Sequence, residues 1–149
     1  MLDDPVAYLD NACVTLKPQS VIDSIQDYYI NTPGCGGRSV HRYGTHVSKT
    51  ISQSRIKLAH FLSSPSVNEI VFTRNATHSL NQIAKGLEWN KGDVVLTTDR
   101  EHNSNLVPWL QLEQEQGIDH RIVRSNQDNT FNLESFEEAC AEAGSNLKM

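Results

Sequence analysis

The chain has 149 residues, the size of one ordinary domain, and its 38% hydrophobic and 21% charged residues are typical of globular proteins. Thirteen Lys and Arg stand against 18 Asp and Glu, which gives a net charge of −5. The basic residues form no run that would follow a phosphate backbone, so we do not expect a nucleic-acid partner. No segment approaches the roughly 18 consecutive apolar residues of a membrane span. The acidic N-terminus is unlike a secretory signal, so we expect a soluble, cytoplasmic protein without a membrane partner.

The three cysteines, Cys13, Cys35 and Cys140, are widely and unequally spaced. This spacing fits neither a disulfide framework nor a pair of zinc ligands, so we expect no metal site. We interpret each cysteine as a small, partly buried apolar residue.

The first part of the chain predicts two amphipathic helices. Pro18 can occupy the first helical position, and the helix is expected to end before Thr32. Its apolar face comprises Val21, Ile22, Ile25, Tyr28 and Tyr29. A glycine-rich loop at residues 34–37 leads into the segment 39–42, which contains His41. A second helix is expected over residues 47–62, whose apolar stripe comprises Val47, Ile51, Leu58 and Leu62.

From residue 69 onwards, short apolar runs alternate with helical patterns. We expect strands over residues 69–73, 93–97 and 121–124. The helical patterns lie around residues 80–87, over 105–116, and after Asn132, which we expect to cap the last helix. This alternation is typical of βαβ units, and it predicts an α/β fold with a mainly parallel sheet covered on both faces.

Ligands of such sheets bind beyond the carboxyl ends of the strands, in the loops that lead into helices. The first of these loops, residues 73–79, is rich in small and hydroxyl residues at the start of a helix. Free backbone N–H groups and the helix dipole favour an anion there, and the Thr77 hydroxyl can add a hydrogen bond. We therefore consider a phosphate site, with ordinary helix capping by Asn75 or Thr77 as the alternative.

The second loop, residues 98–105, places His102 at the same edge of the predicted sheet. An imidazole there can stack on a planar ligand, although a solvated loop histidine explains the residue as well. No G-x-G-x-x-G or G-x-x-x-x-G-K-[ST] motif follows any predicted strand. A phosphate site in this chain is therefore not of the dinucleotide or P-loop kind.

Several short motifs, taken in chain order, carry a family resemblance. They are YLDNA at 8–12 with LKP at 16–18, SVHR at 39–42, TRNAT at 73–77 with LN at 80–81, and EHNSN at 101–105 with PW at 108–109. Together they resemble the opening of the cysteine desulfurases, which belong to the class V aminotransferase group of fold-type I enzymes. That family uses pyridoxal 5′-phosphate, so the resemblance implies this cofactor.

The resemblance also implies roles for individual residues. The residue matching Thr77, with the backbone of the one matching Ala76, holds the cofactor phosphate, and the one matching His102 stacks on the pyridine ring. The residue matching His41 lies on the substrate side, although a polar loop histidine explains His41 equally well. The implied fold is the N-terminal, incomplete portion of the large domain. Residues 1–45 would form an arm, the first helix and an active-site loop, and residues 46–149 the first part of the cofactor-binding domain.

The chain also departs from the family pattern. His78 stands where the family commonly has an acid, and Asn103 stands where it often has a second histidine, so the substrate chemistry can differ. In the family, the Schiff-base lysine, the aspartate that pairs with the pyridinium nitrogen, the substrate-binding arginine and the desulfurase cysteine all match positions beyond this chain. None of the six lysines here stands in the Schiff-base motif. We therefore assign no catalytic residue and expect the chain to be inactive alone.

Two interpretations remain open. The chain is either the front portion of an enzyme that removes sulfur or selenium from cysteine or selenocysteine to give alanine, or a non-catalytic binding or oligomerisation module derived from that fold. A different class V member, such as a sulfinate desulfinase, a lyase or an epimerase, is a further alternative. For the complete enzyme, the resemblance implies a cysteine-like amino-acid substrate, a homodimer and a possible sulfur-acceptor protein.

Overall fold

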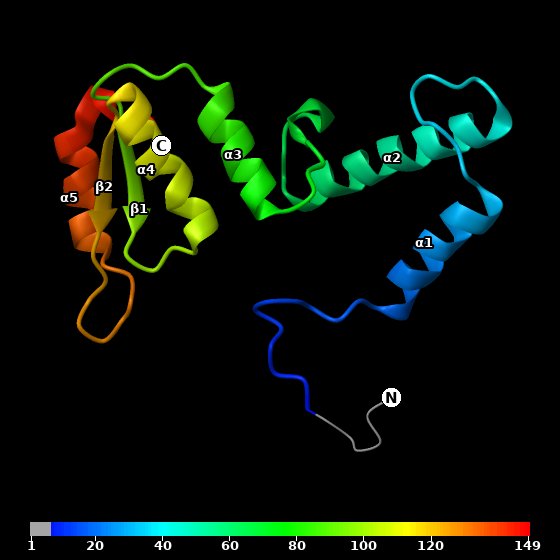
Figure 1. Ribbon diagram of the computed structural model, residues 1–149, viewed down its shortest axis with the longest axis horizontal. Coiled ribbons are helices and arrows are strands. Elements are labelled where there is room, and N and C mark those ends of the chain that lie inside the picture. The colour runs from blue at the N-terminus through cyan, green and yellow to red at the C-terminus, as the bar shows by residue number, and fades with distance from the viewer. Residues whose placement is uncertain (1–6) are drawn as a thin grey trace. The chain divides into compact units, whose positions relative to one another are not determined.

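A computed structural model describes residues 7–149 of the chain (Figure 1). The chain divides into two compact units, Met1–Val71 and Phe72–Met149. The division predicted after residue 45, between the N-terminal arm and the cofactor-binding domain, stays a prediction, and the helix α2 (Arg42–Phe61) spans this position. The units are described one at a time.

The first unit contains the two predicted helices. The helix α1 (Gln19–Asn31) follows Pro18, whose φ of −57° already suits a helix start, and it ends before Thr32 as predicted. The helix α2 begins at Arg42 instead of residue 47. The cause is His41, whose imidazole Nδ1 accepts a hydrogen bond from the Gly44 backbone N–H at 3.4 Å and so caps the helix.

The prediction of a strand over residues 69–73 is wrong. The segment contains the end of a short 3₁₀ helix, η1 (Val67–Glu69), followed by residues without regular structure. The Ile70 carbonyl accepts a hydrogen bond from Arg55 Nε at 3.2 Å, not from a neighbouring strand. A β-branched run becomes a strand only when another strand pairs with its backbone, and the described residues supply none at this position.

The second unit is built around a parallel pair of strands, as the sequence predicted. β1 (Val94–Thr98) pairs with β2 (Asp119–Val123) in a register that sets Val94 opposite Asp119 and Thr98 opposite Val123. The last residues of the chain lie along the other edge of β1: Leu147 forms a parallel bridge with Val94, and the Lys148 N–H donates to the Val94 carbonyl at 2.9 Å. Val94 and Val95 are both almost fully buried, as expected for a strand covered on both faces.

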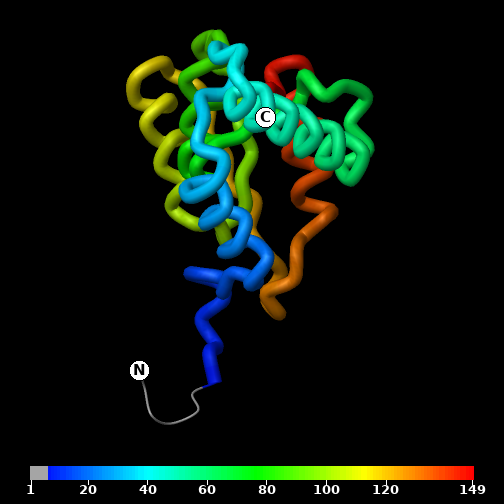
Figure 2. The backbone as a smooth tube through the Cα atoms, turned by 90° about the vertical axis from the view of Figure 1, so that its right-hand side faces the viewer, coloured from blue at the N-terminus to red at the C-terminus, as the bar shows by residue number. Residues whose placement is uncertain are grey.

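Three helices pack around these strands. They are α3 (Ala76–Gly86), α4 (Val107–Gln116) and α5 (Leu133–Ala143), with short 3₁₀ turns η2 (Asn103–Asn105) and η3 (Gly144–Asn146). Figures 1 and 2 show α4 and α5 on opposite sides of the strands. The core of this unit comprises Ala84, Val95, Trp109, Leu112 and Ile118, with Leu80 and Trp89 packed against it. The fold is therefore α/β with a parallel sheet, as predicted.

The cysteines only partly match their expected environment. Cys13 and Cys35 are exposed, which contradicts their interpretation as partly buried residues, and Cys140 on α5 is partly buried as expected. Cys13 and Cys35 lie in loops of the first unit, whereas Cys140 is on a helix that contacts both strands. In the part of the chain that the structure describes, no helix combines the length and apolar character that a membrane span requires.

Candidate functional site

The start of α3 offers backbone N–H groups at the positive end of a helix. Asn75 is the N-cap, and its Oδ1 accepts a hydrogen bond from the His78 N–H at 2.8 Å, so the capping by Asn75 that the sequence offered as the alternative interpretation is present. The Ser79 N–H donates to the Asn75 carbonyl at 3.1 Å. Within residues 7–149, the N–H groups of Ala76 and Thr77 have no hydrogen-bond partner. Capping by Asn75 thus leaves two adjacent donors for an anion.

The loop before α3 is held by its own side chains. The hydroxyls of Thr73 and Ser79 lie 2.6 Å apart, and the Arg74 N–H donates to His78 Nδ1 at 3.3 Å. His78, which departs from the family pattern, therefore has a local structural role. The exposed Thr77 hydroxyl has no partner among the described residues, so it can donate to the same anion as the two N–H groups.

His102 lies in the loop that follows β1, where it caps η2. Its Nδ1 accepts a hydrogen bond from the Ser104 N–H at 3.1 Å, and the Ser104 hydroxyl lies 3.0 Å from the same nitrogen. A ring nitrogen that accepts from a backbone N–H carries no proton, so the proton of the neutral ring is on Nε2. The hydrogen bond at Nδ1 orients the ring, and the residue is exposed. An oriented, accessible ring suits stacking on a planar ligand.

The structure brings the two loops together within the second unit. The turn η2 packs against α3 and against α4. Figure 1 shows that α3 begins on the side of the unit towards which β1 points, where the loop bearing His102 also lies. Ala76, Thr77 and His102 therefore belong to one edge of this unit. His41 belongs to the first unit, where it caps α2 and its ring meets that of Tyr43 edge-on, with the centroids 6.3 Å apart.

A network of hydrogen bonds that was not predicted from the sequence supports the His102 loop. Glu101 Oε1 accepts from the hydroxyl of Thr98 at 2.7 Å and from its N–H at 3.3 Å, and Glu101 Oε2 accepts from Asn105 Nδ2 at 2.8 Å. Asn105 Oδ1 in turn accepts from Trp109 Nε1 at 3.0 Å. The hydrogen bonds from Asn105 and from Thr98 lower the pKa of Glu101. The spacing of four residues between Glu101, Asn105 and Trp109 was the available signal in the sequence.

A second hydrogen-bonded carboxylate joins the loops that follow the two strands. Asp99 Oδ1 accepts from the Ser125 hydroxyl at 2.6 Å and from the Ser125 N–H at 3.0 Å, which lowers the pKa of Asp99. Asp99 and Glu101 are therefore both ionised at neutral pH and engaged by donors. In residues 7–149, no group of three or more His, Cys, Asp or Glu side chains is arranged to hold a metal ion.

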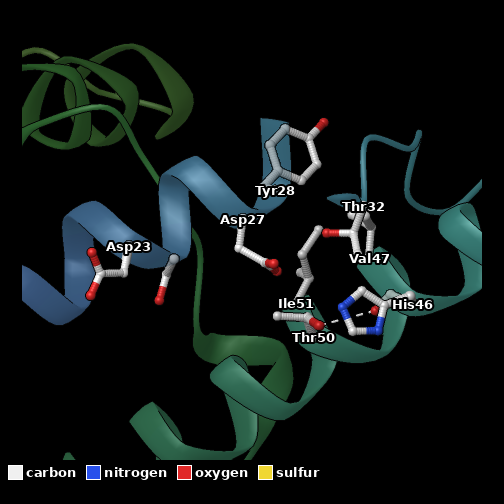
Figure 3. Close-up of a pocket in the computed structure, with 9 residues that line it drawn as sticks. Asp23, Asp27, Tyr28, Thr32, His46, Val47, Thr50 and Ile51 are labelled. Atoms are coloured by element: carbon white, nitrogen blue, oxygen red, sulfur yellow. Dashed lines mark hydrogen bonds between the residues drawn. The ribbon is translucent and has the colours of Figure 1, made fainter. Parts of the chain in front are cut away.

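A separate hollow lies between α1 and α2 in the first unit (Figure 3). Its volume is about 710 Å³, and its walls include Tyr28, Val47 and Ile51 with the carboxylates of Asp23 and Asp27. Figure 3 shows the Asp27 carboxylate directed into this space. Two carboxylates repel a phosphate, and none of the predicted site residues lines the hollow. It is therefore not the phosphate site that the sequence predicts.

Comparison with known proteins identifies relatives across nearly the whole chain. The aminotransferase class V family model matches residues 7–146. A probable cysteine desulfurase from Synechocystis is 35% identical over 141 residues, which are 93% of this chain and 34% of the relative. The apo structure of a cysteine desulfurase from Thermococcus onnurineus NA1 has a TM-score of 0.79 at 30% identity, covering 87% of this chain and 32% of that one. The cysteine desulfurase CsdA from Escherichia coli has a TM-score of 0.72 at 30% identity, covering 89% and 34%. The chain thus spans about a third of the length of these proteins.

Proposed function

Since the chain belongs to the class V aminotransferase family, we propose that it forms the part of a cysteine desulfurase-like enzyme that binds the phosphate and the ring face of pyridoxal 5′-phosphate. The observation that carries this proposal is the pair of unpartnered N–H groups of Ala76 and Thr77, beside a free Thr77 hydroxyl. Three donors at the positive end of a helix suit a phosphate dianion. The residues present therefore fit the cofactor.

Each site residue has a defined task in this proposal. Ala76 and Thr77 hold the phosphate, and the ring of His102 covers one face of the pyridine. The hydrogen bonds that Asn75 Oδ1 accepts from the His78 N–H and that His102 Nδ1 accepts from the Ser104 N–H orient both groups before the ligand arrives, so little freedom is lost on binding. Pyridoxal phosphate, when bound, supplies the electron-withdrawing ring that amino-acid chemistry of this family needs.

We further propose that the chain alone is inactive, because none of its lysines is placed to bond the cofactor. The six are Lys17, Lys49, Lys57, Lys85, Lys91 and Lys148. Lys148 is engaged elsewhere: its Nζ bonds the Asp93 carboxylate at 2.8 Å and the Glu88 carbonyl, and it lies 5.2 Å from the centroid of the Trp89 ring. Mixing the chain with pyridoxal phosphate should give no visible absorption band that depends on a single lysine. A band lost on replacing one lysine would contradict this proposal.

For the whole protein we propose removal of sulfur or selenium from cysteine or selenocysteine. The 35% identity to a probable cysteine desulfurase supports this assignment. His41 is proposed to lie on the substrate side, and a homodimer and a sulfur-acceptor protein are proposed as partners. A non-catalytic module and a different class V activity remain the alternatives, and His78 and Asn103 are the departures that favour a changed substrate.

A comparison of pyridoxal phosphate with pyridoxal tests the cofactor proposal directly. Thr77→Ala removes one hydrogen bond to a charged group, so we expect it to weaken pyridoxal phosphate binding by about tenfold and to leave pyridoxal binding unchanged. Loss of stacking in His102→Ala should weaken both ligands by about fivefold. Fluorescence or calorimetric titration of the 149-residue chain measures these affinities.

Thr50→Ala serves as a matched control, because the exposed Thr50 hydroxyl only donates to the His46 carbonyl of its own helix, at 3.0 Å. This variant should bind both ligands as the parent chain does. Equal affinities of the parent chain for pyridoxal and pyridoxal phosphate would refute a phosphate site at the start of α3.

A further inference from the structure

The hydrogen-bond chain from Thr98 to Trp109 has a fixed direction. An indole Nε1 can only donate, so Trp109 requires Asn105 to present its oxygen, at 3.0 Å. The amide nitrogen of Asn105 must then face Glu101, whose Oε2 lies 2.8 Å away. Glu101 therefore has to be an acceptor on both oxygens, since the hydroxyl and N–H of Thr98 donate to its Oε1. Only an ionised carboxylate meets both demands.

Two members of this hydrogen-bond network, Glu101 and Asn105, flank His102 in the sequence. Glu101 precedes the histidine directly, and the Asn105 N–H donates to the His102 carbonyl at 2.8 Å, which closes the turn η2. At the other end of the hydrogen-bond network, Trp109 is only 1% exposed and packs among the core residues of the second unit. The exposed His102 loop is thus tied to the buried core of this unit.

We propose that Glu101 and Asn105 are positioning residues that set the orientation of the His102 imidazole. They act through the backbone of the turn and do not touch the ligand. The relevance of this orientation to a cofactor rests on the proposed function, but the orientation itself does not. The lowered pKa of Glu101 agrees with a carboxylate that is held ionised by its donors.

Because the direction of each hydrogen bond is fixed, exchanging the carboxylate of Glu101 and the amide of Asn105 tests the proposal. In Glu101→Gln, the new amide group faces the amide group of Asn105, so two donors meet. In Asn105→Asp, two carboxylates meet. When both substitutions are combined, the new amide accepts from Thr98 through its oxygen and donates through its nitrogen to the new carboxylate. That carboxylate also accepts from Trp109, so each donor again has an acceptor. The double variant has the same net charge as the parent chain.

Two measurements on the dilute 149-residue chain report the loop without any ligand. Hydrogen exchange follows the amides of residues 98–105, and the ¹⁵N shift of His102 Nδ1 reports whether this nitrogen still accepts from Ser104. We expect each single variant to speed the exchange by about fivefold or more and to move the Nδ1 shift, and the double variant to restore both. Glu137→Gln, which removes an exposed carboxylate on α5, is the control and should change neither.

The outcomes separate positioning from a purely structural role. If the single variants only lower the urea midpoint while the His102 Nδ1 shift stays at the parent value, the two residues stabilise the fold and the proposal is refuted. Additive effects without rescue in the double variant would also refute it. If the shift and exchange respond and are rescued, the positioning holds. In that case, absence of pyridoxal phosphate binding by the parent chain would count against the proposed function alone.

Discussion

At the residue scale, His120 on β2 is the titrating group with the clearest consequence for stability. Its Nε2 lies 2.8 Å from the Thr97 hydroxyl on β1, and Thr97 is buried. Burial lowers the pKa of His120, although the carboxylates of Glu113 and Asp119 act in the opposite direction. Because the pKa of a histidine in the unfolded chain is about 6.5, protonation below this pH favours the unfolded state.

We therefore expect the free energy of unfolding of the second unit to fall as the pH drops from about 6.5 to the folded-state pKa of His120. Above pH 6.5 the ring is neutral in the folded and the unfolded chain, so it should not make the free energy of unfolding depend on pH. His120→Gln keeps a hydrogen-bonding group for Thr97 and removes the titration, so its stability should change less between pH 7.5 and pH 5.5. Both tryptophans, Trp89 and Trp109, belong to the second unit, so their fluorescence during urea unfolding reports this unit.

His60→Gln provides a comparison for the same pH range, because it removes an exposed imidazole from the first unit. The change in the free energy of unfolding of the second unit between pH 7.5 and pH 5.5 should match that of the parent chain, because the tryptophans report the second unit. A pH slope of His120→Gln as steep as that of the parent chain would assign the effect to other groups.

The sequence could predict that Ala76 and Thr77 lie at the start of a helix and that His102 lies in the loop after a strand, whereas their roles in binding stay predictions. Capping by Asn75 was also accessible, since an Asn before a helix is a local signal. The Glu101 network was not predicted, because its direction is set by Trp109, and the burial of Trp109 is a tertiary property.

At the element scale, the helices and the two paired strands could be predicted, but the start of α2 and the absence of a strand at residues 69–73 could not. The apolar stripe of α2 begins near Val47, whereas its first turn is fixed by the cap at His41, which the apolar pattern does not indicate. Residues 69–73 have the composition of a strand, but strand formation depends on a neighbour elsewhere in the chain. Local pattern thus identifies candidate strands, and which of them form depends on the presence of a partner strand.

The cap of α5 gives a prediction at this scale. Asn132 Oδ1 accepts from the Ser135 N–H at 3.0 Å, so Asn132→Ala leaves this donor without a protein partner. We expect a loss of about 1 kcal/mol in the free energy of unfolding, measured by urea titration with tryptophan fluorescence. Because α5 packs against both strands, the loss should appear in the unfolding of the whole second unit.

Asn132→Asp keeps the acceptor oxygen and adds a negative charge at the helix N-terminus. We therefore expect this variant to be at least as stable as the parent chain. Equal destabilisation by Ala and Asp would mean that the cap is not the source of the effect.

At the scale of the whole molecule, the sheet is incomplete and apolar surfaces are left uncovered in the described part of the chain. Neither strand has a second full-length neighbour in the described part of the chain, and the pairing of residues 147–149 along β1 is short. In the first unit, no residue of α1 is buried, although the helix carries a row of large apolar side chains. Those at least 40% exposed are Val21, Ile22, Ile25, Tyr29 and Ile30.

Such a surface predicts that the 149-residue chain associates with itself. Exposed apolar area is worth roughly 25 cal/mol per Å² when it is buried, and unpaired strand edges add backbone donors and acceptors. The margin of stability of a domain is only about 5–15 kcal/mol, so burial between chains competes with folding. We expect association that increases with protein concentration, seen as aggregates on expression and as hydrophobic-dye binding by the concentrated soluble chain.

Two variants on α1 test whether its exposed apolar side chains cause the association. Ile25 is 54% exposed, and Ile25→Glu places a charge within the apolar row, so it should raise the soluble fraction and lower dye fluorescence. Gln26→Glu adds the same charge at the neighbouring exposed polar position and should have a smaller effect. Light scattering and dye binding at equal protein concentration measure the difference. A sharp cooperative melt of a soluble monomeric parent chain would contradict the prediction and would favour a self-sufficient module.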